Sequence, residues 1–146
     1  MKNVIFLLAV IFLMGCTPEA KEINYGVDMC HFCKMTVVDN QHAAQLVTTK
    51  GKAYMFDAIE CMVNYTATDG EDEYAFLLVN DYNNPGKLIP AKKSHFLRSR
   101  AIPSPMGAYL SAFESEEIVQ NTMETKGGNI HTWDALGDVL KQKLPE

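Results

Sequence analysis

The chain has 146 residues, 47% of them hydrophobic and 21% charged, which is long enough and apolar enough for one folded core. Its net charge of −5 and its lack of a long run of Lys and Arg argue against a nucleic-acid-binding protein. We expect no nucleic acid among its partners.

The first fifteen residues have the pattern of a secretory signal peptide. One Lys precedes eleven apolar residues, and Gly15-Cys16 follows. This apolar run is shorter than the roughly 20 residues that span a bilayer. Residues 13–16 (Leu-Met-Gly-Cys) resemble a bacterial lipobox, with Met14 in place of the usual small residue. We predict a signal peptide over 1–15, a lipid on Cys16 and a membrane-anchored protein of the cell envelope that faces the periplasm or the exterior. The alternative is a plain signal peptide that leaves Cys16 as a free thiol.

Soft metal donors follow a short polar tether at 16–24. Cys30 and Cys33 form a C-x-x-C pair, and Met35 lies two positions further on. Thiolates and thioethers select Cu(I) over hard cations such as Mg²⁺. A closed zinc site needs four good donors, and no second Cys/His pair has ligand spacing. We therefore predict a Cu(I) site at Cys30, Cys33 and Met35. A disulfide or redox pair is the main alternative, and zinc is a weaker one.

The first half of the chain predicts mainly strands and one helix. Strands are expected at 35–38, 43–49, 53–56 and 74–79, with a helix starting at Asp57. Asp57 as N-cap and Glu60 at N3 predict a capping box, with Phe56 and Cys61 as its hydrophobic staple. Cys61 thereby receives a packing role, with a metal or thiol role as the alternative. The inward face of the helix is expected to carry Ile59, Met62, Val63 and Thr66.

A turn-rich segment at 81–86 divides the chain into units at 25–83 and 84–146. The second unit is expected to contain strands at 87–90, 95–97, 108–113 and 129–133, a helix at 115–126 and a terminal amphipathic helix at 134–143. A Gly-Lys-Ala-Tyr run at 51–54 and a Gly-Ala-Tyr run at 107–109 each precede a helix and a strand. The predicted fold is therefore α+β, with two small β-β-α-β units packed together plus a C-terminal helix.

Several stretches together resemble the NosL family, the accessory lipoproteins of nitrous oxide reductase that act as copper chaperones. They are the lipobox, Cys30–Met35, Ala43–Gln45, Tyr54–Asp57, Ser104–Gly107 and Gly127–Ile130. Many family members carry Gly where this chain has Lys34, a change that removes no ligand. The resemblance implies two β-β-α-β units, a similarity to the fold of organomercurial lyase, and copper delivery to a copper-sulfide cluster.

Two further methionines are candidate copper donors. Met106 lies in a loop bounded by prolines and falls within a stretch that resembles the family. We therefore predict it as a further copper donor or a docking contact, and leave the role of Met29 open. His42, His95 and His131 are isolated in the sequence and receive no role.

The sequence thus predicts an exported lipoprotein that is not an enzyme. It would bind Cu(I) and pass it by ligand exchange to an acceptor, for which the resemblance to the family implies nitrous oxide reductase or its maturation complex in the membrane. The alternative is a thiol-disulfide oxidoreductase of the cell envelope, but such enzymes usually place C-x-x-C at a helix N-terminus. Organomercurial lyase activity and a metal-free docking module are more remote alternatives.

Overall fold

The computed structural model describes residues 17–68 and 74–144. The predicted signal peptide and the lipidation site at Cys16 lie outside these ranges. Within the described residues, no helix combines the length and the apolar character needed to cross a membrane.

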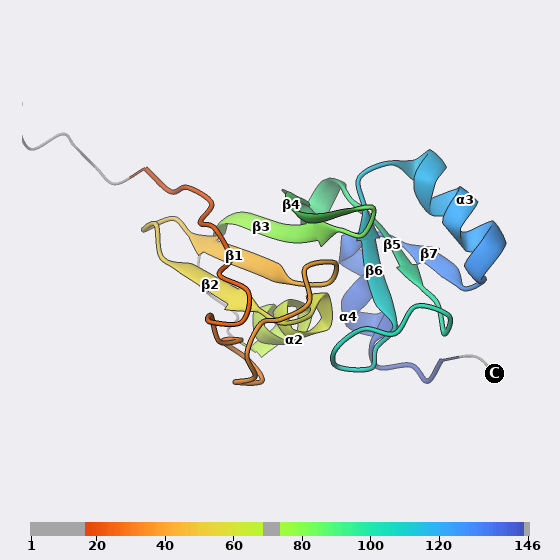
Figure 1. Cartoon of the computed structure of the whole chain (residues 1–146), viewed down its shortest axis with the longest axis horizontal. Helices are drawn as coiled ribbons and strands as arrows, with labels where there is room; N and C mark the ends of the chain where they lie inside the picture. The colour runs from red at the N-terminus through yellow and green to blue at the C-terminus, as the bar shows by residue number, and fades with distance from the viewer. Residues whose placement is uncertain (1–16, 69–73, 145–146) are drawn as a thin grey trace, which may run out of the picture.

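A seven-stranded sheet runs through the molecule (Figure 1). The strand order is β2-β1-β3-β6-β5-β7, and β4 pairs with β3 outside this path. The strands are β1 (Ala44–Thr48), β2 (Ala53–Phe56), β3 (Tyr74–Asp81), β4 (Asn84–Pro90), β5 (His95–Arg98), β6 (Leu110–Phe113) and β7 (Asn129–His131).

The same pairing pattern occurs twice in this sheet. Strand β1 pairs antiparallel with β2 and β3, and α2 (Ile59–Thr68) connects those two. Strand β5 pairs antiparallel with β6 and β7, which α3 (Glu116–Lys126) connects. The two β-β-α-β units join where β3 runs parallel to β6, at Asp81 and Ala112. The α+β fold class is therefore confirmed, whereas the division at residue 83 stays a prediction.

The hydrophobic core lies between the sheet and its helices. Strand β1 is buried along its whole length, and α2 buries Ile59, Met62 and Val63 beneath it, as the periodicity predicts. Thr66, also predicted to face inward, is half-buried. In Figure 1, α2 and the short helix α4 (Leu136–Val139) lie on one side, while α3 covers the other end of the sheet.

The predicted strand at 35–38 is wrong. This segment makes one isolated bridge, between Met29 and Thr36, and otherwise belongs to a loop. The carbonyl groups of Val37 and Met35 accept hydrogen bonds within that loop, from Gly26 N–H at 2.8 Å and from Cys30 N–H at 2.7 Å. Because these hydrogen bonds are made locally, the segment has no sheet partner.

The predicted capping box is also wrong, because α2 begins at Ile59 and both carboxylates serve distant partners. Asp57 accepts a hydrogen bond from Val38 N–H at 3.2 Å. Glu60 accepts one from the Ser104 hydroxyl at 2.5 Å. Long-range contacts thus replace the local reciprocal pair.

The second unit follows its predicted elements except at the C-terminus. Gly127, at φ +66°, ends α3 as expected, and its N–H donates to Met123 O at 2.7 Å. The expected helix at 134–143 is reduced to a 3-10 turn (Trp133–Ala135) followed by α4. The guanidinium of Arg98 donates hydrogen bonds to the backbone carbonyls of Val139 and Gln142. A longer helix would use these carbonyls for its own backbone hydrogen bonds.

Candidate metal site

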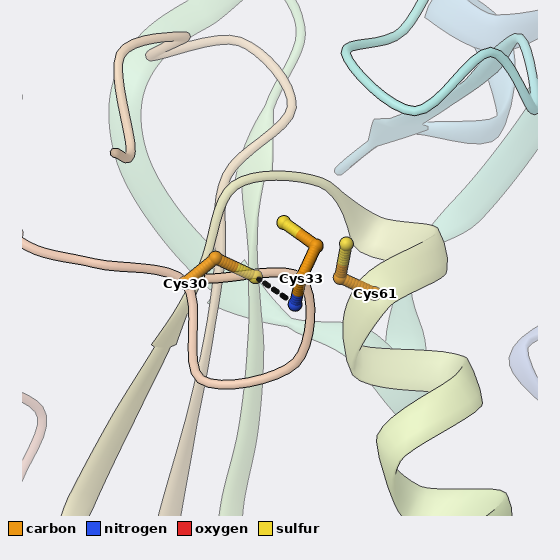
Figure 2. Close-up of side chains that lie close together, drawn as sticks. All are labelled: Cys30, Cys33 and Cys61. Atoms are coloured by element: carbon orange, nitrogen blue, oxygen red, sulfur yellow. Dashed lines mark hydrogen bonds between the residues drawn. The ribbon is translucent and has the colours of Figure 1, made fainter. Parts of the chain in front are cut away.

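The side chains of three cysteines lie close together (Figure 2). Cys30 and Cys33 come from the loop before β1, and Cys61 comes from the first turn of α2. Their sulfur atoms all lie within 4.8 Å of one another, and all three are free thiols. Among the described residues, this cluster contains no fourth Cys, His or carboxylate. The arrangement is therefore a compact three-sulfur site that could hold a metal ion.

Contacts to β2 and α2 hold the loop in place over the helix. The backbone N–H of His31 donates to Met55 O at 2.8 Å. The His31 ring packs against Tyr54, with centroids 4.2 Å apart, and against Tyr65 at 5.2 Å. Since Tyr65 is one turn beyond Cys61, this aromatic contact brings the C-x-x-C loop to the start of α2.

The three sulfurs differ in protonation because they bond to one another. The pKa of Cys30 falls to about 4, mainly because the Cys61 thiol donates a hydrogen bond to its sulfur. The backbone N–H groups of Asp57 and Cys33 also donate to Cys30, the latter at 3.4 Å. The same hydrogen bond raises the pKa of Cys61, and burial raises the pKa of Cys33. At pH 7 the free site holds one thiolate and two thiols.

Access to the cluster runs past Cys33. Cys30 and Cys61 are fully buried, whereas Cys33 is half-buried. Met35 is 52% exposed and Met29 61% exposed. The backbone N–H of Met35 donates to the Cys33 sulfur, so this residue adjoins the site. The structure thus puts an exposed thioether residue beside the accessible thiol, and Met35 as a ligand stays a prediction.

Lys34 holds a strained backbone conformation between Cys33 and Met35. Its φ is +66°, a left-handed region that costs an L-residue about 1–2 kcal/mol. Glycine avoids this cost but loses more chain entropy on folding. We expect Lys34→Gly to raise the free energy of unfolding by about 0.5–1 kcal/mol in urea titrations. Lys50→Gly, at a residue without positive φ, should lower it, and equal effects of both variants would refute the strain.

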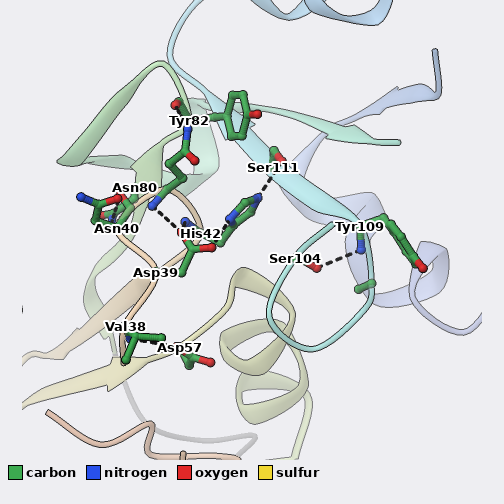
Figure 3. Close-up of polar contacts among 12 residues, drawn as sticks. Val38, Asp39, Asn40, His42, Asp57, Asn80, Tyr82, Ser104, Tyr109 and Ser111 are labelled. Atoms are coloured by element: carbon green, nitrogen blue, oxygen red, sulfur yellow. Dashed lines mark hydrogen bonds and ion pairs between the residues drawn. The ribbon is translucent and has the colours of Figure 1, made fainter. Parts of the chain in front are cut away.

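The loop that contains Met106 is anchored by hydrogen bonds to Glu60, the residue that precedes Cys61. One carboxylate oxygen of Glu60 accepts hydrogen bonds from the Ser104 hydroxyl at 2.5 Å and from Ala108 N–H at 3.3 Å. The Ser104 oxygen accepts another from Tyr109 N–H at 2.9 Å (Figure 3). Met106 is 43% exposed and lines a pocket with Glu60. Its role as a copper donor or docking contact stays a prediction.

Removing the hydroxyl of Ser104 tests this fastening. Ser104→Ala leaves the buried carboxylate of Glu60 without its shortest hydrogen bond, so we expect about 1–3 kcal/mol lower stability in urea. Ser115→Ala is the control, because the Ser115 side chain makes no capping hydrogen bond to α3. If the two variants lost the same stability, the loop would not depend on the contact to Glu60.

A second polar cluster has the residue types of a hydrolase triad. His42 contacts Asp39 through Nδ1 at 2.9 Å and Ser111 through Nε2 at 3.0 Å (Figure 3). Ser111 is fully buried, so a substrate carbon cannot approach its oxygen. The cluster instead ties the turn before β1 to β6 and thereby connects the two β-β-α-β units.

The structure brings together the predicted Cys30 and Cys33, and it adds Cys61, for which the sequence had favoured packing. The signal for Cys61 was the odd number of thiols that would remain after removal of the predicted signal peptide, since an unused free thiol is a liability in an exported chain. Its place in the cluster depends on the docking of the loop against α2, which spacing along the sequence does not reveal.

Comparisons with known proteins agree with this geometry. The family model of NosL matches residues 23–140. The crystal structure of the copper chaperone NosL from Shewanella denitrificans superposes with a TM-score of 0.70 at 19% identity. That match covers 82% of this chain and 96% of the other, and it concerns the fold. No curated protein matches the sequence. Since the family match includes both β-β-α-β units and all three clustered cysteines, the chain belongs to the NosL family.

Proposed function

We propose that the protein is an exported lipoprotein copper chaperone that binds one Cu(I). Cys30 and Cys33 supply two thiolates, Cys61 supplies a third, and Met35 provides an exchangeable thioether at the entrance. The observation that carries this proposal is the meeting of three sulfurs within 4.8 Å, two from a loop and one from a helix.

The donor set favours Cu(I) over other ions. Within the described part of the chain, the cluster offers three thiol sulfurs and no His or carboxylate ligand, which suits a soft monovalent ion that accepts two or three donors. Zinc in a structural site requires four donors. Disulfide formation would compete in an oxidising compartment, and a bound Cu(I) would protect the thiolates from it.

Transfer would proceed by ligand exchange and not by dissociation into water. The buried Cys30 and Cys61 anchor the ion, while the half-buried Cys33 and the exposed Met35 are the donors that an acceptor can replace one at a time. We propose as acceptor nitrous oxide reductase or its maturation complex in the membrane, with the lipid on Cys16 keeping the chaperone at that surface.

Anaerobic titration of the reduced protein with Cu(I) against a competing chelator tests the proposal. We expect one equivalent to bind tightly, with affinity lost in Cys33→Ser and weakened in Met35→Ala. Met123→Leu, in α3 and packed on a separate core cluster, should bind like the unaltered protein. Absent binding in the unaltered protein, or equal binding in Cys33→Ser, would refute the proposal.

The low pKa of Cys30 also suits a redox thiol, so the oxidoreductase alternative needs its own test. The C-x-x-C pair lies in a turn before an irregular segment and not at a helix N-terminus. The third thiol would moreover divert any disulfide that forms. We expect no reduction of insulin by the protein, and turnover in that assay would favour the alternative.

A further inference from the structure

A pocket of about 340 Å³ lies at the opposite end of the sheet from the three cysteines. It is lined by residues of β5 and β7 and by the segments that follow α3 and α4. Among the residues that the structure describes, its charged lining is basic: Arg98, Arg100, Lys126, His131 and Lys143. The chain as a whole has 18 acidic and 13 basic residues. An all-basic pocket on an acidic protein is a local concentration of positive charge that the overall composition does not predict.

Arg98 is fixed at the floor of this pocket by three backbone carbonyls. Its Nε donates to Ala108 O at 3.2 Å, one terminal nitrogen to Val139 O at 2.6 Å, and the other to Gln142 O at 3.0 Å. These bonds use three of the five N–H donors of a guanidinium. The group is thus held in one orientation while its charge meets only neutral carbonyls in these contacts.

The backbone is equally constrained where β7 begins. A Cβ on Gly128 would lie 2.3 Å from the carbonyl oxygen of Arg98, so only glycine allows this approach. The Ser99 hydroxyl donates to Lys126 O at 2.8 Å and holds the end of α3 against β5. Lys126 is therefore brought next to Arg98 and Arg100 by the fold.

The imidazole of His131 lies within the electrostatic influence of Arg98. His131 has a lowered pKa, first because it is buried and second because Arg98 is close. A bound anion would counteract the second effect.

We propose that this pocket binds a phosphate-type oxyanion. A fixed guanidinium surrounded by further cations matches a tetrahedral group with several acceptor oxygens, which Arg binds by parallel hydrogen bonds. The pocket volume accommodates one phosphate with a small substituent. The group is either free phosphate or the phosphodiester of a lipid headgroup, since both present negatively charged non-bridging oxygens on a tetrahedral phosphorus.

Amide and histidine NMR spectra of the reduced protein provide the test. Inorganic phosphate is titrated at constant ionic strength against chloride, followed by a soluble short-chain phosphatidylglycerol and the corresponding phosphatidylcholine. We expect saturable shifts at residues 126–131 and a raised pKa of His131. The doubly substituted Arg100→Gln/Lys143→Gln variant should bind at least about tenfold more weakly. The control pair Lys92→Gln/Lys93→Gln removes two charges outside this pocket and should bind normally.

The lipid arms distinguish the two sources. Binding of phosphatidylglycerol and phosphate with the same loss in the variant identifies a lipid headgroup site, and binding of phosphate alone identifies a free-anion site. Either result supports the proposal. Absence of saturable shifts with every anion, or equal weakening in both charge variants, would overturn it, whatever the copper titration shows.

Discussion

The Cys61→Ser variant is expected to bind Cu(I) more than about 100-fold more weakly than the unaltered protein. Removing a residue that only hydrogen-bonds to a metal ligand already lowers metal affinity by about 10–100-fold, and Cys61 is itself a proposed ligand. Cys61 is fully buried with its sulfur in the three-cysteine cluster, so its loss leaves two thiolates for the ion. Serine keeps a hydroxyl that can still donate to Cys30, which separates ligand loss from loss of the hydrogen bond. Competition titration with a Cu(I) chelator gives the affinity.

Two comparisons make this result specific. Unfolding in urea checks that Cys61→Ser remains folded. The Met106→Leu variant measures how much the Met106 thioether, which lines a pocket with Glu60, contributes to Cu(I) affinity. A Cys61→Ser variant that is folded and retains the affinity of the unaltered protein would return Cys61 to the packing role. The ion would then depend on Cys30, Cys33 and Met35.

The apparent Cu(I) affinity is expected to fall about 100-fold for each unit by which pH drops between 8 and 5. Affinity falls as pH falls because the metal-free site carries protons that the ion must displace. Cys33 and Cys61 have raised pKa values and carry protons in this range, while Cys30, with a pKa of about 4, does not. Binding to all three as thiolates therefore releases two protons. Lower pH restores those protons in competition with the ion.

Chelator competition at several pH values measures the slope, and proton release in weak buffer counts the protons directly. Cys61→Ser should show a slope of about tenfold per pH unit, since a single proton, that of Cys33, is then displaced. A slope near tenfold in the unaltered protein would mean that Cys61 stays protonated when the ion is bound. A pH-independent affinity would exclude thiolate ligation by both Cys33 and Cys61.

The sequence predicted the order of the elements well because each is encoded locally. The buried β1 strand, the apolar face of α2 and the Gly127 end of α3 are readable from patterning. Asp57 and Glu60 were misassigned because their partners, Val38 and Ser104, are far along the chain. Side chains that satisfy distant backbone groups leave no periodic signal.

Of the three clustered cysteines, two are identifiable from local sequence spacing and one is brought in by a contact between distant segments. The C-x-x-C spacing points to Cys30 and Cys33 directly, whereas Cys61 joins them only through the docking of His31 on Tyr54 and Tyr65. Lys34 lies between Cys33 and Met35 in a left-handed backbone conformation. Its φ of +66° gives a physical reason for the glycine that many family members carry there, and this chain tolerates the strain.

The site also joins two segments that lie far apart in the sequence, the C-x-x-C loop and the first turn of α2. A metal ion on Cys33 and Cys61 closes a loop of roughly 30 residues that contains β1 and β2, a constraint comparable to a disulfide and worth about 3–4 kcal/mol in chain entropy. Without the ion, the N-terminal segment is held by hydrogen bonds, by aromatic contacts and by the buried side chains of Ile23, Cys30 and Val37. Loading would therefore act as a reversible cross-link, so that resistance to proteolysis near the tether reports whether the carrier is full or empty.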